Sequence, residues 1–302
     1  MKKTGFLISI MLSLLFCSCS NIKNLRLSYK AIRGFKDTPV FELAKAVMNQ
    51  DTKKIRRIGI QNSELLYTED SEYHYSVLHF AIYLQKYKSA EALLDIGMSA
   101  NVQSSSSGQT PLYIAAFYSE IDIKFMKLLV EHGADPDLGI KPAGKSLQAE
   151  GATPLMQLPT MHIPSQKTNM EKAEYLIETG KADINKSDID GNTAANEALQ
   201  VQDVKMAEYF IVDLKADVTK PYYSPDSVVL KGEEKSMHYP VNLLRNWWIY
   251  PLDSEEYKIK MEIVKEFERQ GVDYSATPIP DWVLEKIKRQ YPDTWEEYIK
   301  VY

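Results

Sequence analysis

The chain of 302 residues is 44% hydrophobic and 25% charged, with a formal net charge of -5 at pH 7. This composition is that of an ordered, folded protein and excludes a disordered or collagen-like chain. The small acidic excess gives no reason to expect a nucleic acid as partner, because nucleic-acid binding depends on a surplus of basic residues.

The N-terminus has the organisation of a secretory signal peptide. Lys2 and Lys3 precede an apolar run from Phe6 to Phe16, and small residues follow this run. A run of about eleven apolar residues is shorter than the roughly twenty that a transmembrane helix needs. We therefore expect residues 1–18 to be removed after export.

Both cysteines of the chain, Cys17 and Cys19, follow this apolar run. The sequence around them resembles the lipobox of bacterial lipoproteins, in which a small residue precedes the cysteine that is acylated. Because Ser18 is small and Phe16 is bulky, Cys19 is the better lipidation site. Ser20 resembles the sorting signal for the outer membrane, which implies an outer-membrane lipoprotein that faces the periplasm. An ordinary signal peptide with two incidental cysteines is the alternative.

Residues 19–40 are expected to form a lipid-anchored tether. The stretch from residue 21 to residue 36 contains no acidic residue and five basic ones, which are Lys23, Arg26, Lys30, Arg33 and Lys36. Such a composition suits a segment that lies close to anionic lipid headgroups. A solvated linker explains the same residues equally well.

A short pattern recurs from about residue 41 onward. It appears at residues 76–81 (SVLHFA), 110–115 (TPLYIA), 153–156 (TPLM) and 193–198 (TAANEA). Each copy is followed by a second helical pattern, most completely at residues 128–135 (LLVEHGAD). These motifs resemble the ankyrin-repeat family, whose units carry T-P-L-H-x-A and end in a glycine-containing turn. Proline at a first helical turn and glycine after a last one explain the pattern physically.

This resemblance predicts an all-α ankyrin-repeat solenoid over residues 41–275, with about five to six helix-turn-helix units joined by short hairpin turns. A degenerate first unit near Leu43 would act as the N-terminal cap. Helices at residues 281–290 and 293–302 would form a C-terminal cap over residues 276–302. Two spacings exceed the roughly 33 residues of the family, so we expect inserted loops around residues 141–150 and 159–168.

Two motifs resemble ligand-binding sites, but the residues around each motif argue against ligand binding. Residues 139–146 (GIKPAGKS) match the phosphate-binding string G-x-x-x-x-G-K-[ST], but a P-loop needs a strand before it and a helix after it. Residues 188–191 (DIDG) resemble part of a calcium loop, although Lys186 occupies the position of its first carboxylate. The five histidines are scattered, and no G-x-S-x-G motif is present. We therefore expect no nucleotide, metal or other cofactor, and no catalytic activity.

Ankyrin units commonly bind other proteins through a concave groove, which the fifth and eighth positions of each unit face. These positions hold Phe80 and Tyr83 in one unit, and Ile114 and Phe117 in the next. Exposed aromatic and aliphatic groups of this size indicate an interaction site, so we predict a protein-binding patch here. Two loop-tip residues would form its polar rim, namely Ser106 and Asp190. The alternatives are that an insertion or the tether folds over the patch, or that the register is shifted by one.

The resemblance thus implies a non-catalytic binding scaffold that is anchored in the bacterial envelope. Lipoproteins of this organisation also resemble immunity proteins that neutralise secreted antibacterial effectors such as phospholipases. An envelope structural or assembly factor with a permanent protein partner is the alternative. Genes beside this one would discriminate between these two roles.

Overall fold

The computed structural model describes residues 32–143, 149–160, 163–225 and 235–302. The expected signal peptide, Cys19 and the first part of the tether lie outside these residues. No helix in the described part of the chain is both long enough and apolar enough to cross a membrane.

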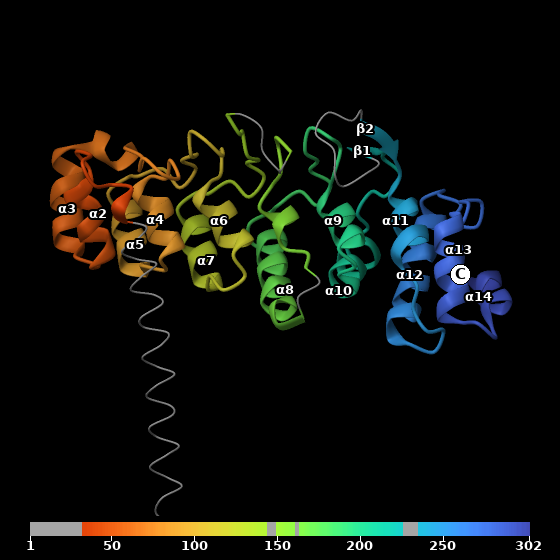
Figure 1. The fold of residues 1–302 in the computed structure, drawn as a ribbon. Coiled ribbons are helices and arrows are strands. Elements are labelled where there is room, and N and C mark those ends of the chain that lie inside the picture. Colours follow the sequence, from red (N-terminus) through yellow and green to blue (C-terminus); the bar gives the residue numbers. More distant parts are fainter. Residues whose placement is uncertain (1–31, 144–148, 161–162, 226–234) are drawn as a thin grey trace, which may run out of the picture.

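The described residues form an elongated stack of paired helices (Figure 1). Each unit consists of a first helix and a second helix. In units one to three, α2 (Phe41–Met48) pairs with α3 (Thr52–Gln61), α4 (Val77–Tyr83) with α5 (Tyr87–Asp95), and α6 (Pro111–Phe117) with α7 (Ile123–Glu131). In units four to six, η2 (Leu155–Gln157) pairs with α8 (Ile163–Glu178), α9 (Ala194–Gln200) with α10 (Val204–Ala207) and η3 (Glu208–Asp213), and α11 (Pro240–Trp247) with α12 (Glu255–Arg269). A short helix, η1 (Ser63–Tyr67), follows the first unit, and α13 (Asp281–Gln290) and α14 (Trp295–Val301) end the stack. The predicted all-α solenoid with a helical cap is therefore confirmed.

The signature residues act as helix caps. Thr110 accepts a hydrogen bond from the Tyr113 amide at 3.0 Å, and Pro111 occupies the first turn of α6. Gly133 has a φ of 81° after the end of α7, a conformation that is strained for other residues. Because these signals act within a few residues, each helix boundary follows from its local sequence.

The fourth unit differs from its neighbours. Its first helix, η2, is only 3 residues long, whereas α8, at 16 residues, is the longest helix in the described part of the chain. The expectation of a loop over residues 159–168 is wrong in part, because α8 already begins at Ile163. Residues 165–168 (SQKT) contain no glycine or proline that would stop a helix from extending through them.

Finger loops connect each unit to the next and project from one side of the stack (top in Figure 1). Their described parts are residues 68–75, 101–109, 135–143 with 149–152, 183–192, and 217–225 with 235–238. The last finger contributes a two-stranded antiparallel sheet, β1 (Tyr222–Pro225) with β2 (Lys235–His238), in which Tyr222 faces His238.

Side chains of one finger bind the backbone of the next. The side-chain oxygen of Asn101 accepts a hydrogen bond from the Asp135 amide at 2.7 Å. Further along the stack, the Asp137 carboxylate accepts from the Asp183 amide at 3.0 Å, and Asn185 accepts from the Asp217 amide at 2.8 Å. This ladder fixes the spacing of consecutive fingers.

The packed structure begins within the segment that was expected to be a tether. Ile32 and Phe35 are buried, and the ring of Phe35 meets the edge of Phe80 with centroids 5.2 Å apart. The Gly34 carbonyl accepts a hydrogen bond from the Ser71 amide at 2.9 Å. A Cβ atom at Gly34 would lie 2.5 Å from a carboxylate oxygen of Asp70, so this close approach requires glycine.

The C-terminal cap is held to the sixth unit by buried basic and aromatic side chains. The Arg245 guanidinium lies 4.0 Å from the ring centroid of Tyr274 and donates a hydrogen bond to the Tyr302 carbonyl. Lys260 donates to the Trp248 carbonyl at 3.0 Å, and its amine lies 3.6 Å from the ring centroid of Tyr302. Burial lowers the pKa of Lys260 to about 6.

Candidate protein-binding face

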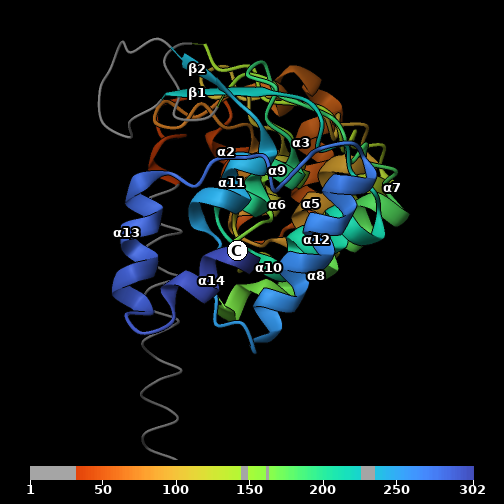
Figure 2. The same cartoon turned by 90° about the vertical axis from the view of Figure 1, so that its right-hand side faces the viewer.

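The first helices of the units lie in one row and the second helices in another, as the view along the stack shows (Figure 2). We call the side formed by the first helices and the finger loops the inner face. It contains the four residues that the sequence predicts as an exposed patch.

The predicted exposure is wrong for two of these four residues. Phe80 is 3% exposed and Ile114 is 1% exposed, whereas Phe117 is 44% exposed and Tyr83 is half-buried. Phe80 is covered because the segment that contains Phe35 folds against it. Ile114 is covered because α6 packs between α4, α7 and η2 and buries every residue from Pro111 to Ala116.

A different aromatic cluster takes their place. We call Tyr73, Tyr75, Tyr83, Phe117 and Tyr118 the aromatic patch. Tyr83 and Phe117 each meet Tyr118 edge-on, with centroids 5.3 and 5.0 Å apart. Tyr73, which is 45% exposed, stacks on Tyr75 at 6.0 Å. The two residues of the prediction that remain accessible thus belong to a larger aromatic surface.

The phenols of Tyr73, Tyr75 and Tyr118 stay protonated at neutral pH. Burial, followed by the nearby carboxylate of Glu72, raises the pKa of Tyr73, and burial likewise raises the pKa of Tyr75 and Tyr118. The Tyr75 hydroxyl donates a hydrogen bond to Gln109 at 2.6 Å. The patch therefore presents neutral rings together with hydroxyl groups.

Tyr73, Tyr75 and Tyr118 lie outside the helices and were missed by the helical register. The signal that could have found them is the sequence Tyr73-His74-Tyr75 directly before a repeat signature, since loop aromatic residues at that place point over the next helix.

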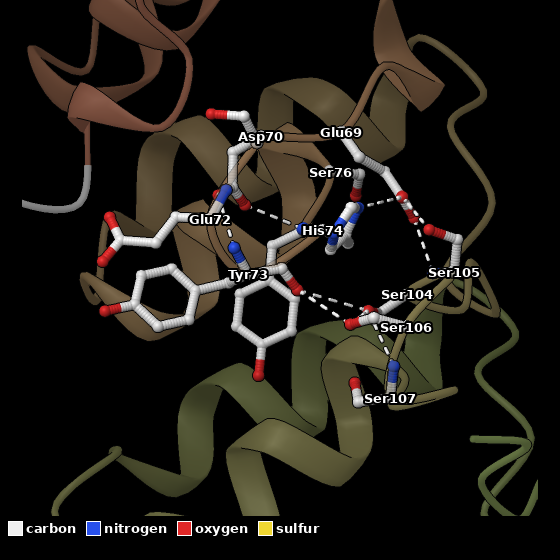
Figure 3. A network of polar contacts seen from close by, with 12 residues as sticks. Glu69, Asp70, Glu72, Tyr73, His74, Ser76, Ser104, Ser105, Ser106 and Ser107 are labelled. Atoms are coloured by element: carbon white, nitrogen blue, oxygen red, sulfur yellow. Dashed lines mark hydrogen bonds and ion pairs between the residues drawn. The ribbon is translucent and has the colours of Figure 1, made fainter. Parts of the chain in front are cut away.

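A polar network holds the first finger in place (Figure 3). The buried carboxylate of Asp70 accepts hydrogen bonds from the amides of Glu72, Tyr73 and Tyr75 at 2.8, 2.7 and 2.8 Å. Glu69 accepts from both the amide and the hydroxyl of Ser105 in the next finger. A carboxylate with three amide donors strongly constrains its loop, so Tyr73 and Tyr75 are presented from a defined backbone.

The two predicted rim residues occupy separate places. Ser106 is exposed, and its hydroxyl lies 3.4 Å from the Tyr73 carbonyl, beside the aromatic patch (Figure 3). Asp190 is half-buried in a later finger, where its carbonyl accepts a hydrogen bond from the Tyr223 amide at 2.8 Å. Only Ser106 therefore adjoins the patch.

His79 occupies the histidine position of the repeat signature and hydrogen-bonds neighbouring backbone. His79 is fully buried, its Nδ1 accepts a hydrogen bond from the Ser76 amide at 3.3 Å, and its Nε2 donates to the Gln109 carbonyl at 2.9 Å. Burial lowers the pKa of His79 to about 4. His79 is thus a neutral structural residue.

The motifs that resemble ligand sites have structural roles where they are described. The Asp188 carboxylate accepts hydrogen bonds from the amides of Asp190 and Asn192, both at 2.9 Å, so this segment forms a turn. After Gly139, the Ile140 amide donates to the Ala152 carbonyl at 3.1 Å. Gly144, Lys145 and Ser146 lie outside the described residues. In the described part of the chain, no group of three or more His, Cys, Asp or Glu is placed to hold a metal ion.

The fifth unit contributes a titratable group to the inner face. Burial raises the pKa of Glu197 to about 7, and Asn192 donates a hydrogen bond to its carboxyl group. A polar pocket of about 460 Å³ lies beside it, between the last two fingers, and is lined by residues that include Asn185, Thr193 and Lys220.

The comparison with known families agrees with this architecture. A model described as ankyrin repeats in three copies matches residues 43–140 and 78–186, and one described as ankyrin repeats in many copies matches residues 162–211. No curated protein matches the chain. Together the two models span residues 43–211, which is more than half of the 302 residues. The chain therefore belongs to the ankyrin-repeat family, whose members generally serve as non-catalytic scaffolds for protein–protein interaction.

Proposed function

We propose that this protein is a non-catalytic scaffold that is anchored in the bacterial envelope through Cys19 and that binds another protein in the groove of its inner face. The observation that carries the proposal is the aromatic patch, in which Tyr73 and Phe117 are 45% and 44% exposed. Large aromatic side chains that stay accessible in a well-packed stack are typical anchors of protein interfaces.

Rigidity of the inner face supports the same proposal. The first finger is held by Asp70 and Glu69, and His79 bonds the next finger, so the backbone that presents the patch is already ordered. A preformed surface binds with less loss of conformational entropy than a flexible one. A rigid surface of this kind suits a protein that binds its partner tightly and thereby blocks it.

The proposed anchor limits where the stack can lie. The chain between Cys19 and Ile32 reaches at most about 45 Å when fully extended. Substitution Cys19→Ser should abolish incorporation of labelled palmitate and release the protein from membranes under mild washing. Unchanged incorporation would assign the lipid elsewhere, and Cys17→Ser is the matched control.

The biological role that we propose is immunity, in which the scaffold neutralises a secreted antibacterial effector such as a phospholipase. An effector blocked at the periplasmic face would need an inhibitor that is retained there and is preformed. Both the proposed lipid anchor and the rigid inner face suit that task.

Site-specific photocross-linking tests the binding face in producing cells. A benzophenone amino acid is introduced at Tyr83 or Phe117 on the inner face. The controls carry it at Glu91 in α5 or Glu131 in α7, which belong to the row of second helices and are called the outer positions. We expect a cross-linked partner from the inner positions only. Cross-linking to a secreted effector would support the immunity role, and cross-linking to an envelope-assembly component would support the alternative role. Cross-links confined to the outer positions would contradict the proposed binding face.

A further inference from the structure

The finger loops concentrate the acidic excess of the chain. The chain as a whole has 41 acidic and 36 basic residues. The described parts of the fingers have ten acidic residues against four lysines and no arginine, namely Glu69, Asp70, Glu72, Asp135, Asp137, Glu150, Asp183, Asp188, Asp190 and Asp217 against Lys141, Lys186, Lys220 and Lys235. Because the fingers project from one side (Figure 1), their charges add to a negative field along that edge of the inner face.

Exposed carboxylates also flank the aromatic patch. Glu72 lies near enough to Tyr73, and Glu120 near enough to Tyr118, for each carboxylate to raise the pKa of the neighbouring phenol further. The nearby amine of Lys172 is buried and donates to the Ala115 and Tyr118 carbonyls at 2.9 and 3.1 Å. Its charge acts on Glu120 from beneath the surface, but the buried amine is itself inaccessible to a partner.

Among the residues that the structure describes, few basic side chains lie next to the patch. The adjoining N-terminal segment carries Arg33 and Lys36, which are both exposed. His74 lies 3.8 Å from Glu69 and adds positive charge only when it is protonated. The accessible rings of the aromatic patch therefore lie between carboxylates that nearby basic side chains only partly balance.

The combination of exposed aromatic rings and carboxylates favours a basic partner over an apolar or acidic one. A guanidinium or ammonium group can lie over a tyrosine or phenylalanine ring and at the same time bind a carboxylate. The chain already has one such contact, because the Lys45 amine lies 5.0 Å from the ring centroid of Phe41 while it pairs with Glu42 at 2.7 Å. A purely apolar partner would bury Glu72 and Glu120 without compensation, and an acidic partner would be repelled.

We propose that the aromatic patch binds a basic segment of the partner protein, with arginine or lysine side chains stacked on Tyr73 and Phe117 and paired with Glu72 and Glu120. This inference rests on the proposed function, since it specifies the partner segment that the inner face receives.

Peptide binding to the purified full chain tests this inference by fluorescence anisotropy. One labelled peptide alternates arginine with leucine, and a second has citrulline in place of arginine, which keeps the shape and removes the charge. We expect the arginine peptide to bind at least tenfold more tightly than the citrulline peptide. Its affinity should also fall as salt is raised, because surface ion pairs are screened.

Matched variants locate the binding. The pair Glu72→Gln with Glu120→Gln should weaken binding of the arginine peptide at least fivefold, and Phe117→Leu, which keeps an apolar group but removes the ring, should weaken it severalfold. The pair Glu91→Gln with Glu131→Gln removes the same charge from α5 and α7 of the same two units and should leave the affinity unchanged. Equal binding of both peptides, or equal losses in the two pairs, would overturn the inference.

The cross-linking experiment separates this inference from the proposed function. If Tyr83 and Phe117 positions capture a partner through a neutral or acidic segment, the inference of a basic segment is wrong while the binding face stands. If those positions capture nothing and the outer positions do, the proposed function fails first.

Discussion

Truncation of the two phenylalanines of the predicted patch, which occupy the fifth position of one unit and the eighth position of the next, should have very different costs. Phe80 is 3% exposed and pairs with Phe35, so Phe80→Ala removes a buried ring and leaves a cavity. Such changes cost about 3 to 5 kcal/mol of unfolding free energy. Phe117 is 44% exposed, so it buries only about half of its side chain. Full burial of a phenylalanine contributes about 1.5 to 3 kcal/mol, and we expect Phe117→Ala to cost roughly 1 kcal/mol.

Urea unfolding followed by far-UV circular dichroism measures this difference. The four tryptophans are at positions 247, 248, 282 and 295, so their fluorescence reports the sixth unit and the cap. If the stack unfolds unit by unit, Phe80→Ala should shift the dichroism transition to lower urea while the fluorescence transition moves less. The double variant Phe35→Ala with Phe80→Ala should cost less than the sum of the single changes, because the rings form an aromatic pair. If Phe80→Ala cost no more than Phe117→Ala, the burial of Phe80 beneath the N-terminal segment would be refuted.

The remaining predictions concern stability, the patch and nucleotides. The pKa of His79 is lowered to about 4 by burial, so its contribution to the unfolding free energy is present above its unfolded pKa near 6.5 and is lost as the pH falls toward 4. Between pH 7 and pH 5 the unfolding free energy should fall by about 2 kcal/mol more in the wild type than in His79→Asn. Asn101→Ala removes the acceptor of the Asp135 amide and should cost roughly 1 to 2 kcal/mol, a loss that amide hydrogen exchange should localise to the fingers around it. Replacing Tyr83 and Phe117 together by alanine should weaken partner binding by roughly 2 to 4 kcal/mol, and unimpaired binding would move the site elsewhere. Calorimetry with ATP and Mg²⁺ should show no heat of binding, and a saturable signal that Lys145→Ala removes would contradict this.

The sequence by itself determined the fold and the order of its helices. Thr110, Pro111 and Gly133 act through hydrogen bonds and dihedral angles within a few residues, so the repeat signature carries its structure with it. The cap helices are local in the same way, and the helix expected at residues 281–290 is α13. Repetition adds a second constraint, because each unit buries its apolar faces against a neighbour of similar sequence.

Only the tertiary structure decided which residues of the inner face are accessible. The position of Phe80 in its repeat predicts exposure, but the ring is covered by Phe35, which lies in a segment that carries no repeat signature. Conversely, Tyr73 and Tyr75 reach the inner face because Asp70 accepts hydrogen bonds from their amides and folds the loop over α4. Periodicity reports the direction of a side chain from its own helix, whereas burial depends on what distant segments place in front of it.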